Sequence, residues 1–313
     1  MLKFFVRRVA MGVVMLVVIS TVAYLLVYLT GADIARNLLG QNATEDTVRA
    51  KAHELGLDQP LITRYLHWLS QALTGQLGDS WTSGAPVTQL LASRLGVTLS
   101  LVVISTLIAA VIAGALGVLA AVQRGGIDRV IQVLSLIGAA IPNYLTALAL
   151  VLIFAINLKL LAPTGYTRPE DNFPGWVGSI VLPVTALVIG AVAGIAQQVR
   201  GAMIDGLRQD YVRTLRSRGL PERRVIFEHV LRNAGGPALS VLALNFVGLL
   251  GGAVVIEQLF AIPGLGSMSV AATTIGDIPV IMGVVVTVAI IVLIVNLVID
   301  ILQGWLNPKA RVS

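Results

Sequence analysis

Six long apolar runs constrain the fold of this chain more than any other feature of its sequence. A helix needs about 20 apolar residues to cross the hydrocarbon core of a bilayer, and a backbone in lipid must satisfy its own hydrogen bonds. Hydrophobic residues make up 56% of the 313 positions and charged residues only 12%, unlike a soluble domain. The sequence therefore predicts an all-α integral membrane protein with six transmembrane helices. The expected spans are 9–29, 97–122, 130–161, 176–199, 237–260 and 280–302.

The segments within and between these spans carry further signals. Pro142 lies inside the third span and predicts a kink or break there, because proline removes a backbone donor from a helix. The polar stretch 31–96 is too long for a tight turn and has short helical patterns at 54–69, so we expect a small external cap or a lateral elaboration. The stretch 261–279, which contains IPGLG and Asp277, is expected to be a loop.

Lysine and arginine are divided unequally between the two sides of this arrangement. With the N-terminus inside, 15 of the 22 basic residues fall on inside segments and 7 on outside segments. Such an excess marks the cytoplasmic loops of membrane proteins. Both termini and the segment 208–233 are therefore expected in the cytoplasm. The net charge of +6 is explained by topology, and no nucleic acid partner is expected.

The segment 208–233, RQDYVRTLRSRGLPERRVIFEHVLRN, is a long charged run between two apolar spans. Gly219 predicts the end of a first helix, because glycine accepts the left-handed conformation that ends helices. Pro221 and Glu222 suit the start of a second helix. The sequence thus predicts a helical hairpin whose second helix lies across the membrane surface as a docking element. The apolar side of that second helix would consist of Val225, Ile226, Val230 and Leu231.

Several kinds of chemistry lack their sequence signals. There are no cysteines, which excludes disulfides and thiol-ligated zinc, and the three histidines have no metal-ligand spacing. The P-loop, HExxH and GxSxG motifs are missing, so nucleotide hydrolysis through a P-loop and hydrolysis by the other two motifs are not expected. We therefore expect no catalytic residue, no cofactor and no metal ion in this chain.

Ionisable residues are scarce inside the apolar spans, which weakens the case for a carrier driven by an ion gradient. The candidate pathway or gate residues are Asn245, Glu257 and Asn296, although for Glu257 an interfacial or helix-pairing role is favoured. A membrane pathway without its own energy source that carries an arginine-rich hairpin points to an external motor. The alternatives are a stand-alone secondary transporter or channel, and a lipid-binding scaffold.

Five separated motifs resemble those of one protein family. The stretch 210–234, DYVRTLRSRGLPERRVIFEHVLRNA, resembles the EAA coupling loop of bacterial ABC importer permeases of the dipeptide/oligopeptide/nickel type (DppB/OppB-like). FFVRR at 4–8 and LGLDQPLITRYLHWL at 55–69 resemble the family's N-terminal start and external segment. GGAVVIEQLFAIPGLGSM at 251–268 and NLVIDILQGWLNPKAR at 296–311 resemble its fifth-span signature and its ending. The resemblance covers nearly the whole chain.

The resemblance implies a type I importer permease fold, with a cytoplasmic coupling helix and an external segment between the first two spans. The coupling loop would occupy 200–237. The divisions of the chain would be an N-terminal transmembrane helix at 1–30, an extracytoplasmic segment at 31–93, the permease domain at 94–303 and a cytoplasmic tail at 304–313.

The resemblance also implies partners and a substrate class. The family pairs such a permease with a second, usually non-identical permease, two ATP-binding subunits that hold ATP and magnesium, and an extracytoplasmic substrate-binding protein, all at the bacterial cytoplasmic membrane. The chain would form half of the pathway for di- or oligopeptides, although relatives also handle nickel chelates and some glycosides or opines. The residues implied in coupling to the ATPase are Asp210, Tyr211, Arg213, Thr214, Arg216, Arg218, Gly219, Leu220, Pro221, Glu222, Arg223 and Arg224.

Overall fold

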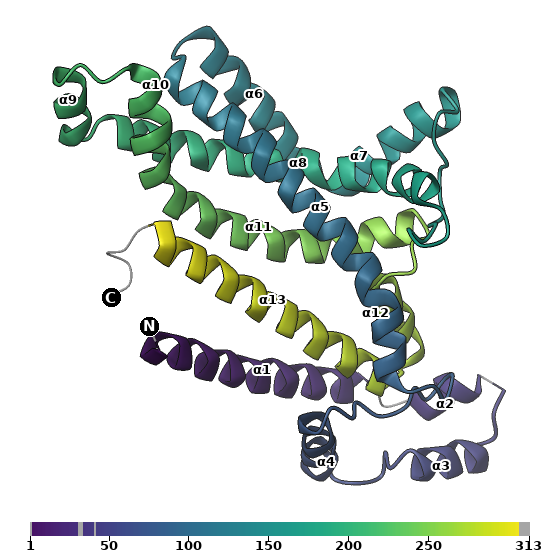
Figure 1. Cartoon of the computed structure of the whole chain (residues 1–313). Coiled ribbons are helices and arrows are strands. Elements are labelled where there is room, and N and C mark those ends of the chain that lie inside the picture. The colour runs from purple at the N-terminus through teal and green to yellow at the C-terminus, as the bar shows by residue number, and fades with distance from the viewer. Residues whose placement is uncertain (1, 31–33, 41, 307–313) are drawn as a thin grey trace. The chain divides into compact units, whose positions relative to one another are not determined.

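The computed structural model describes residues 2–30, 34–40 and 42–306, and every regular element in these ranges is a helix (Figure 1). This confirms the all-α architecture, while most of the expected tail at 304–313 lies outside the described residues. The elements are α1 (Leu2–Thr30), α2 (Ile34–Leu39), α3 (Glu45–Glu54), α4 (Leu61–Leu73), α5 (Val87–Val122), α6 (Gly126–Ala140), α7 (Asn143–Leu150), the π-helix η1 (Val151–Asn157), α8 (Phe173–Leu207), α9 (Asp210–Ser217), α10 (Glu222–Arg224), the π-helix η2 (Val225–Val230), α11 (Leu231–Leu259), α12 (Leu265–Ile275) and α13 (Ile278–Leu306).

Within the described residues, five helices are long and apolar enough to cross a membrane, and the number is six if one sharply bent pair of helices is counted as a single span. The pair consists of α6 followed by α7 and η1, which meet at 96°. With this pair counted as one span, the number agrees with the six spans predicted from the apolar runs. The five continuous spans are Val6–Val27, Val87–Val122, Phe173–Leu207, Glu222–Leu259 and Ile278–Trp305.

The break in the third span lies at Pro142, as predicted, and it is a sharp bend rather than a mild kink. Ile141 ends α6 with φ −88° and ψ 119°, the extended region to which residues before proline are restricted. Pro142 then caps the start of α7. Because α6 has only 15 residues, it is shorter than the roughly 20 residues of a complete span.

The second helix of the charged segment is not a separate surface helix, which corrects the expectation from sequence. α10, η2 and α11 follow one another without interruption and form a single run of 38 residues, Glu222–Leu259. The helix continues through Gly235, Gly236 and Pro237, although glycine and proline are the residues that most often end or kink a helix. The hairpin is therefore joined directly to the fifth span.

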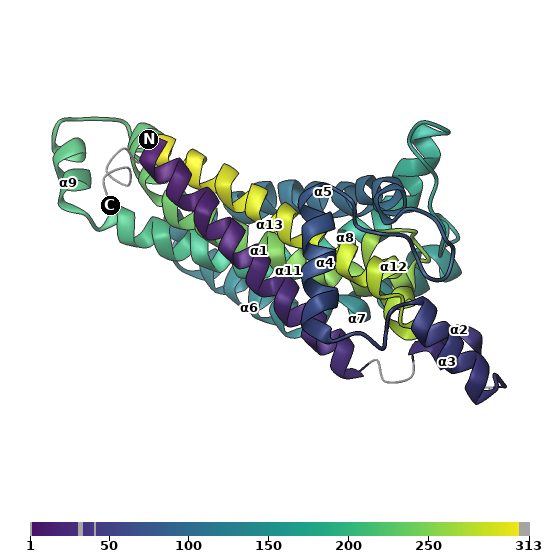
Figure 2. The ribbon, with the colours of Figure 1, turned by 90° about the horizontal axis from the view of Figure 1, so that it is seen from below.

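The chain divides into two compact units, and each is described by itself. The first unit comprises 1–97 and 263–294, and the second comprises 98–262 and 295–313. In the first unit, α4 runs across α1 (Figure 2). Its buried core consists of Tyr24, Ile34, Trp68, Ile278 and Met282.

The first unit also contains a helix where the sequence predicted only a loop. The stretch 261–279 includes α12, which ends at Gly276 in the left-handed conformation with φ 88°. The prediction was wrong because only Ile262, Pro263 and Gly264 of IPGLG precede the helix, while Leu265 and Gly266 already form its first turn. Asp277 follows directly and is buried. Its carboxylate accepts hydrogen bonds from Ser80 Oγ at 2.6 Å and from the backbone N–H groups of Trp81 and Thr82, both at 3.2 Å.

Replacing Asp277 by alanine is expected to release the turn around Ser80. The substitution removes the acceptor of three hydrogen bonds, and leaving such donors unsatisfied costs about 1–3 kcal/mol each when they are buried. Because Trp81 is only partly buried and Thr82 is exposed, we expect a total loss of roughly 2–4 kcal/mol. Amide hydrogen exchange at Trp81 and Thr82 should become faster. Asp277→Asn keeps one acceptor oxygen and should show a smaller change, whereas unchanged exchange in the alanine variant would contradict this role.

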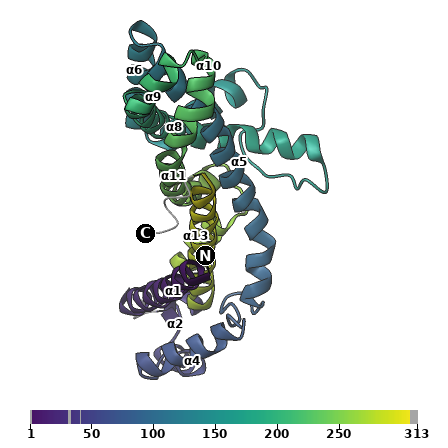
Figure 3. The same ribbon diagram turned by 60° about the vertical axis from the view of Figure 1, so that its left-hand side comes forward.

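In the second unit α8 is the central helix and packs against α6, α7 and α11. Of the residues in its most apolar stretch, 61% are buried. Gly117 of α5 permits a close approach, because a Cβ atom there would lie 2.8 Å from the carbonyl oxygen of Ala196 in α8. Arg200 of α8 forms two hydrogen bonds to the carboxylate of Asp128 in α6, at 2.5 and 2.7 Å. Figure 3 shows α6, α8, α9 and α10 together at one end of this unit.

Candidate functional site

The charged hairpin of α9, α10 and η2 has a turn built on Gly219. The N–H of Gly219 donates to the carbonyl of Arg216 at 2.9 Å, and the N–H of Leu220 donates to the carbonyl of Leu215 at 3.3 Å. Gly219 has φ 78°, which confirms its predicted left-handed conformation. Pro221 then precedes α10 with φ −57°, and its carbonyl accepts from the N–H of Arg224 at 2.9 Å. The sequence of the turn therefore determines both helix ends.

The apolar side chains of the hairpin point inward and hold it against the rest of the second unit. Val212 of α9 is fully buried. In η2 the predicted apolar side is buried at Val225, Ile226 and Val230. Asn233 Nδ2 of α11 also donates to Tyr211 Oη of α9 at 3.0 Å, which joins the two arms. The hairpin is thus a packed element and not a loose loop.

The charged side chains of the hairpin point outward. Asp210 and Arg213 have 98% and 82% of their side chains exposed. Arg216 Nε donates to Glu222 Oε2 at 3.0 Å across the turn, and this hydrogen bond raises the pKa of the Arg216 guanidinium. Arg218 is exposed and makes no ion pair with any described residue. The outer surface therefore carries cations available to an acidic partner.

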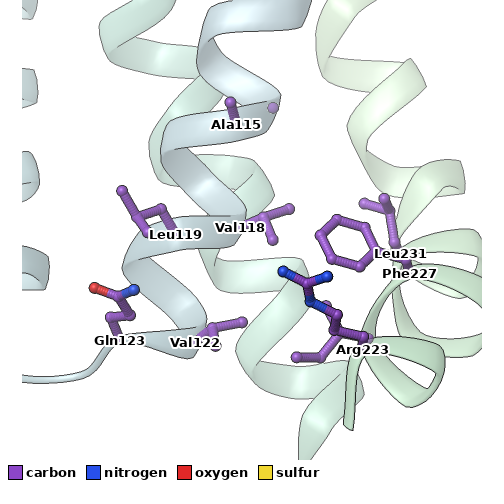
Figure 4. A pocket seen from close by; sticks show the side chains of 10 residues that line it. Ala115, Val118, Leu119, Val122, Gln123, Arg223, Phe227 and Leu231 are labelled. Carbon is purple, nitrogen blue, oxygen red and sulfur yellow. The ribbon is translucent and has the colours of Figure 1, made fainter. Parts of the chain in front are cut away.

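An apolar groove of about 490 Å³ lies between the hairpin and α5. Figure 4 shows the side chains of Arg223 and Phe227 directed toward Val118 and Val122 of α5. Phe227 is 56% exposed, which is high for an aromatic side chain in a helix. Sequence reasoning did not identify this groove, because its two walls are about a hundred positions apart in the chain. The full lining is Gly114, Ala115, Val118, Leu119, Val122, Gln123, Arg223, Ile226, Phe227 and Leu231.

All twelve residues implied in coupling, which lie between Asp210 and Arg224, belong to one hairpin. The candidate pathway residues lie elsewhere. Asn245 Nδ2 donates to the carbonyl of Val241 within its own helix at 2.9 Å. Glu257 is fully buried and accepts a hydrogen bond from Thr98 Oγ1 of α5 at 2.6 Å. Asn296 lies exposed on α13. At about 1.5 Å per residue, Glu257 is roughly 18 Å along α11 from Asn245, so these two do not form one site.

Family models match both halves of the chain. A model described as "Binding-protein-dependent transport system inner membrane component" matches residues 113–312. A second model, for the N-terminal part of such membrane components, matches residues 1–102. Together they cover almost the whole length, including the hairpin and the broken third span.

Curated relatives match over their full length. A probable peptide ABC transporter permease of Sinorhizobium fredii is 34% identical over 98% of this chain and 99% of its own. A putative peptide permease of Brucella suis is 36% identical over 100% of both chains, and the oligopeptide transport system permease AppB of Bacillus subtilis is 34% identical over 99% of both. Among solved structures, an inward-facing MetNI methionine ABC transporter matches with a TM-score of 0.58 and 19% identity, over 70% of this chain and 97% of that one.

Proposed function

The chain belongs to the family of binding-protein-dependent transport system inner membrane components, and from this premise we propose that it forms half of the translocation pathway of an ATP-driven importer of di- or oligopeptides. The relatives reported above carry names of peptide permeases, and the family is one of transport permeases and not of catalytic subunits. ATP and magnesium would be held by separate ATP-binding subunits. A second permease and an extracytoplasmic binding protein would complete the assembly.

The observation that carries this proposal is the construction of the hairpin. Its inner side is packed through Val212, Val225 and Val230, while its outer side exposes Asp210 and Arg213. A segment of this kind can be gripped from outside without unfolding. We therefore assign it as the contact with the ATP-binding subunit, which places the hairpin and both chain termini in the cytoplasm, in accord with the excess of basic residues.

The same construction provides a route for motion. One arm of the hairpin continues from the end of α8 through Gln209, and the other arm continues into α11 as one helix. α8 and α11 also pack against each other along the second unit. A displacement of the hairpin would therefore move two spans at once. This rigid-body movement would open the pathway alternately to each side of the membrane.

Reconstitution tests the proposal. Proteoliposomes that contain this chain with the permease, ATPase and binding-protein subunits that co-purify with it are expected to accumulate labelled di- or oligopeptide only when ATP is supplied on the hairpin side. Proteoliposomes with this chain alone are expected to accumulate none. Uphill uptake by the chain alone would favour a stand-alone secondary transporter, and the absence of any co-purifying ATPase would also contradict the proposal.

A further inference from the structure

The helix α4 has an apolar surface wider than the part covered by its own unit. Tyr65 and Trp68 pack toward α1 together with Leu61, Leu69 and Ala72. Three further apolar side chains remain exposed, Ile62 at 70%, Leu66 at 55% and Leu73 at 81%. With 3.6 residues per turn, these three lie within about 40° of one another around the helix. They extend the apolar face sideways from the contact with α1.

The opposite side of α4 is polar. Its residues include a basic side chain and His67, whose Nε2 lies 3.1 Å from Gln71 Nε2. A helix with one wide apolar face and one polar, basic face is typical of segments that lie in the plane of a membrane interface. The polar side consists of Thr63, Arg64, His67, Ser70 and Gln71.

The contacts of Tyr65 fix the depth of α4 along the first span. Tyr65 Oη lies 2.8 Å from Thr21 Oγ1 and 3.0 Å from Ser20 Oγ in α1. The apolar stretch of that helix runs from Val6 to Val27. Because a helix rises about 1.5 Å per residue, Thr21 is roughly 9 Å inside the end of that stretch. The hydroxyl of Tyr65 therefore reaches below the membrane surface, and α4 cannot stand clear of the bilayer.

The residues around α4 within its unit are typical of the boundary between the hydrocarbon core of a membrane and the lipid headgroups. Its aromatic residues Tyr65 and Trp68 stack on each other, with ring centroids 6.1 Å apart, and Tyr65 also contacts Tyr24, at 5.4 Å. Tyrosine and tryptophan gather where hydrocarbon meets the headgroups. Only 17% of the residues in the most apolar stretch of α1 are buried. The helix that α4 contacts therefore exposes most of its apolar surface, which faces lipid if α1 spans the membrane. Figure 2 shows α4 running across α1 and not alongside it.

We propose that α4 is an in-plane membrane helix, in the leaflet opposite the chain's N-terminus, with Ile62, Leu66 and Leu73 in contact with lipid acyl chains. The occupant of this face is lipid, because the face is uncharged, lies at the depth of the apolar span and continues the lipid-exposed surface of α1. The polar face, with the exposed side chains of His67 and Ser70, points toward the headgroups. The stretch 31–96 is thus only partly an external cap, and α4 anchors it to the bilayer.

The absence of cysteine allows a direct test on the full chain. Single variants Leu66→Cys and Leu73→Cys are spin-labelled and measured in phosphatidylcholine/phosphatidylglycerol nanodiscs, with oxygen and a water-soluble nickel chelate as paramagnetic relaxers. Val14→Cys on α1, where Val14 is 62% exposed, is the lipid reference, and Arg49→Cys on α3 is the water reference. His67→Cys is the matched control on the polar side of the same helix.

We expect the labels at 66 and 73 to respond to oxygen as the label at 14 does, and the labels at 67 and 49 to respond to the nickel chelate. The measurement is repeated in the assembled transporter that co-purifies with the chain. Nickel accessibility at 66 and 73 equal to that at 49 would overturn the proposal in favour of a water-exposed cap. Loss of access to both relaxers in the assembly would also overturn it, because a protein partner would then cover the face. Neither outcome depends on transport, so this test is independent of the proposed function.

Discussion

Replacing Gly219 by proline is expected to lower ATP-driven uptake roughly a hundredfold while the chain still inserts into the membrane. Gly219 has φ 78°, which proline cannot adopt because its ring fixes φ near −65°. Proline also removes the N–H that donates to Arg216. A cost of about 3 kcal/mol to the native turn reduces the competent population by roughly two powers of ten. Uptake and stimulation of ATPase activity are the measurements, with membrane content determined in parallel.

Gly219→Asn is the matched control for this prediction. Asparagine enters the left-handed region more readily than other residues with a side chain, and a Cβ atom at this position would meet nothing within 4 Å. Uptake in the asparagine variant should therefore stay within a few-fold of the original protein. If proline and asparagine reduced uptake equally, or if proline left it unchanged, the conformation of this turn would have no part in coupling.

The reason for so large an effect at one residue is the way in which the hairpin is closed. Arg216 and Glu222 form an ion pair across the turn, and Tyr211 is hydrogen-bonded to Asn233 of α11. These contacts can form only if the turn between the two arms has the left-handed conformation at Gly219. Each outer contact is exposed and contributes little alone, so Gly219 is the position at which the geometry is determined.

Local sequence signals predicted the elements whose cause is local. The apolar runs gave the spans, Pro142 gave the break in the third span, and Gly219 with Pro221 gave the hairpin turn. In each case the conformation follows from one residue, a proline or a glycine, or from one uninterrupted apolar run. The family resemblance was also recognisable, because its motifs are contiguous stretches of sequence.

Other features could not be predicted because their cause is distant in the chain. The hydrogen bond from Ser80 to Asp277 joins residues separated by 197 positions, and the bond from Thr98 to Glu257 joins residues separated by 159. No periodicity indicates such pairs. The helix α12 and the uninterrupted run from α10 into α11 were missed for a different reason. Pro263 and Gly264 before α12, and Gly235, Gly236 and Pro237 within α11, are residues that usually mark turns or helix ends, but here helix continues beside or through them.

The ion pair between Asp128 and Arg200 provides the second large effect. It joins α6, one half of the broken span, to the central helix α8, and the side chains are only 13% and 23% exposed. Removing one partner of a buried pair leaves an uncompensated charge and costs about 3–5 kcal/mol, which partial exposure here reduces to roughly 2–3 kcal/mol. We expect this loss for Arg200→Leu, measured as the free energy of unfolding in mixed micelles.

Exchange of the two charges distinguishes the ion pair from simple packing. In the double variant Asp128→Arg with Arg200→Asp the attraction is restored, and Gln132, which now donates to Asp128 at 2.9 Å, can turn its amide to offer an oxygen to the new arginine. We therefore expect the double variant to recover at least half of the stability lost by the two single variants together. A loss equal to the sum of the single losses would show that the pair does not hold α6 to α8, because independent sites are additive and interacting sites are not. α6 would then be attached to α8 by apolar packing alone.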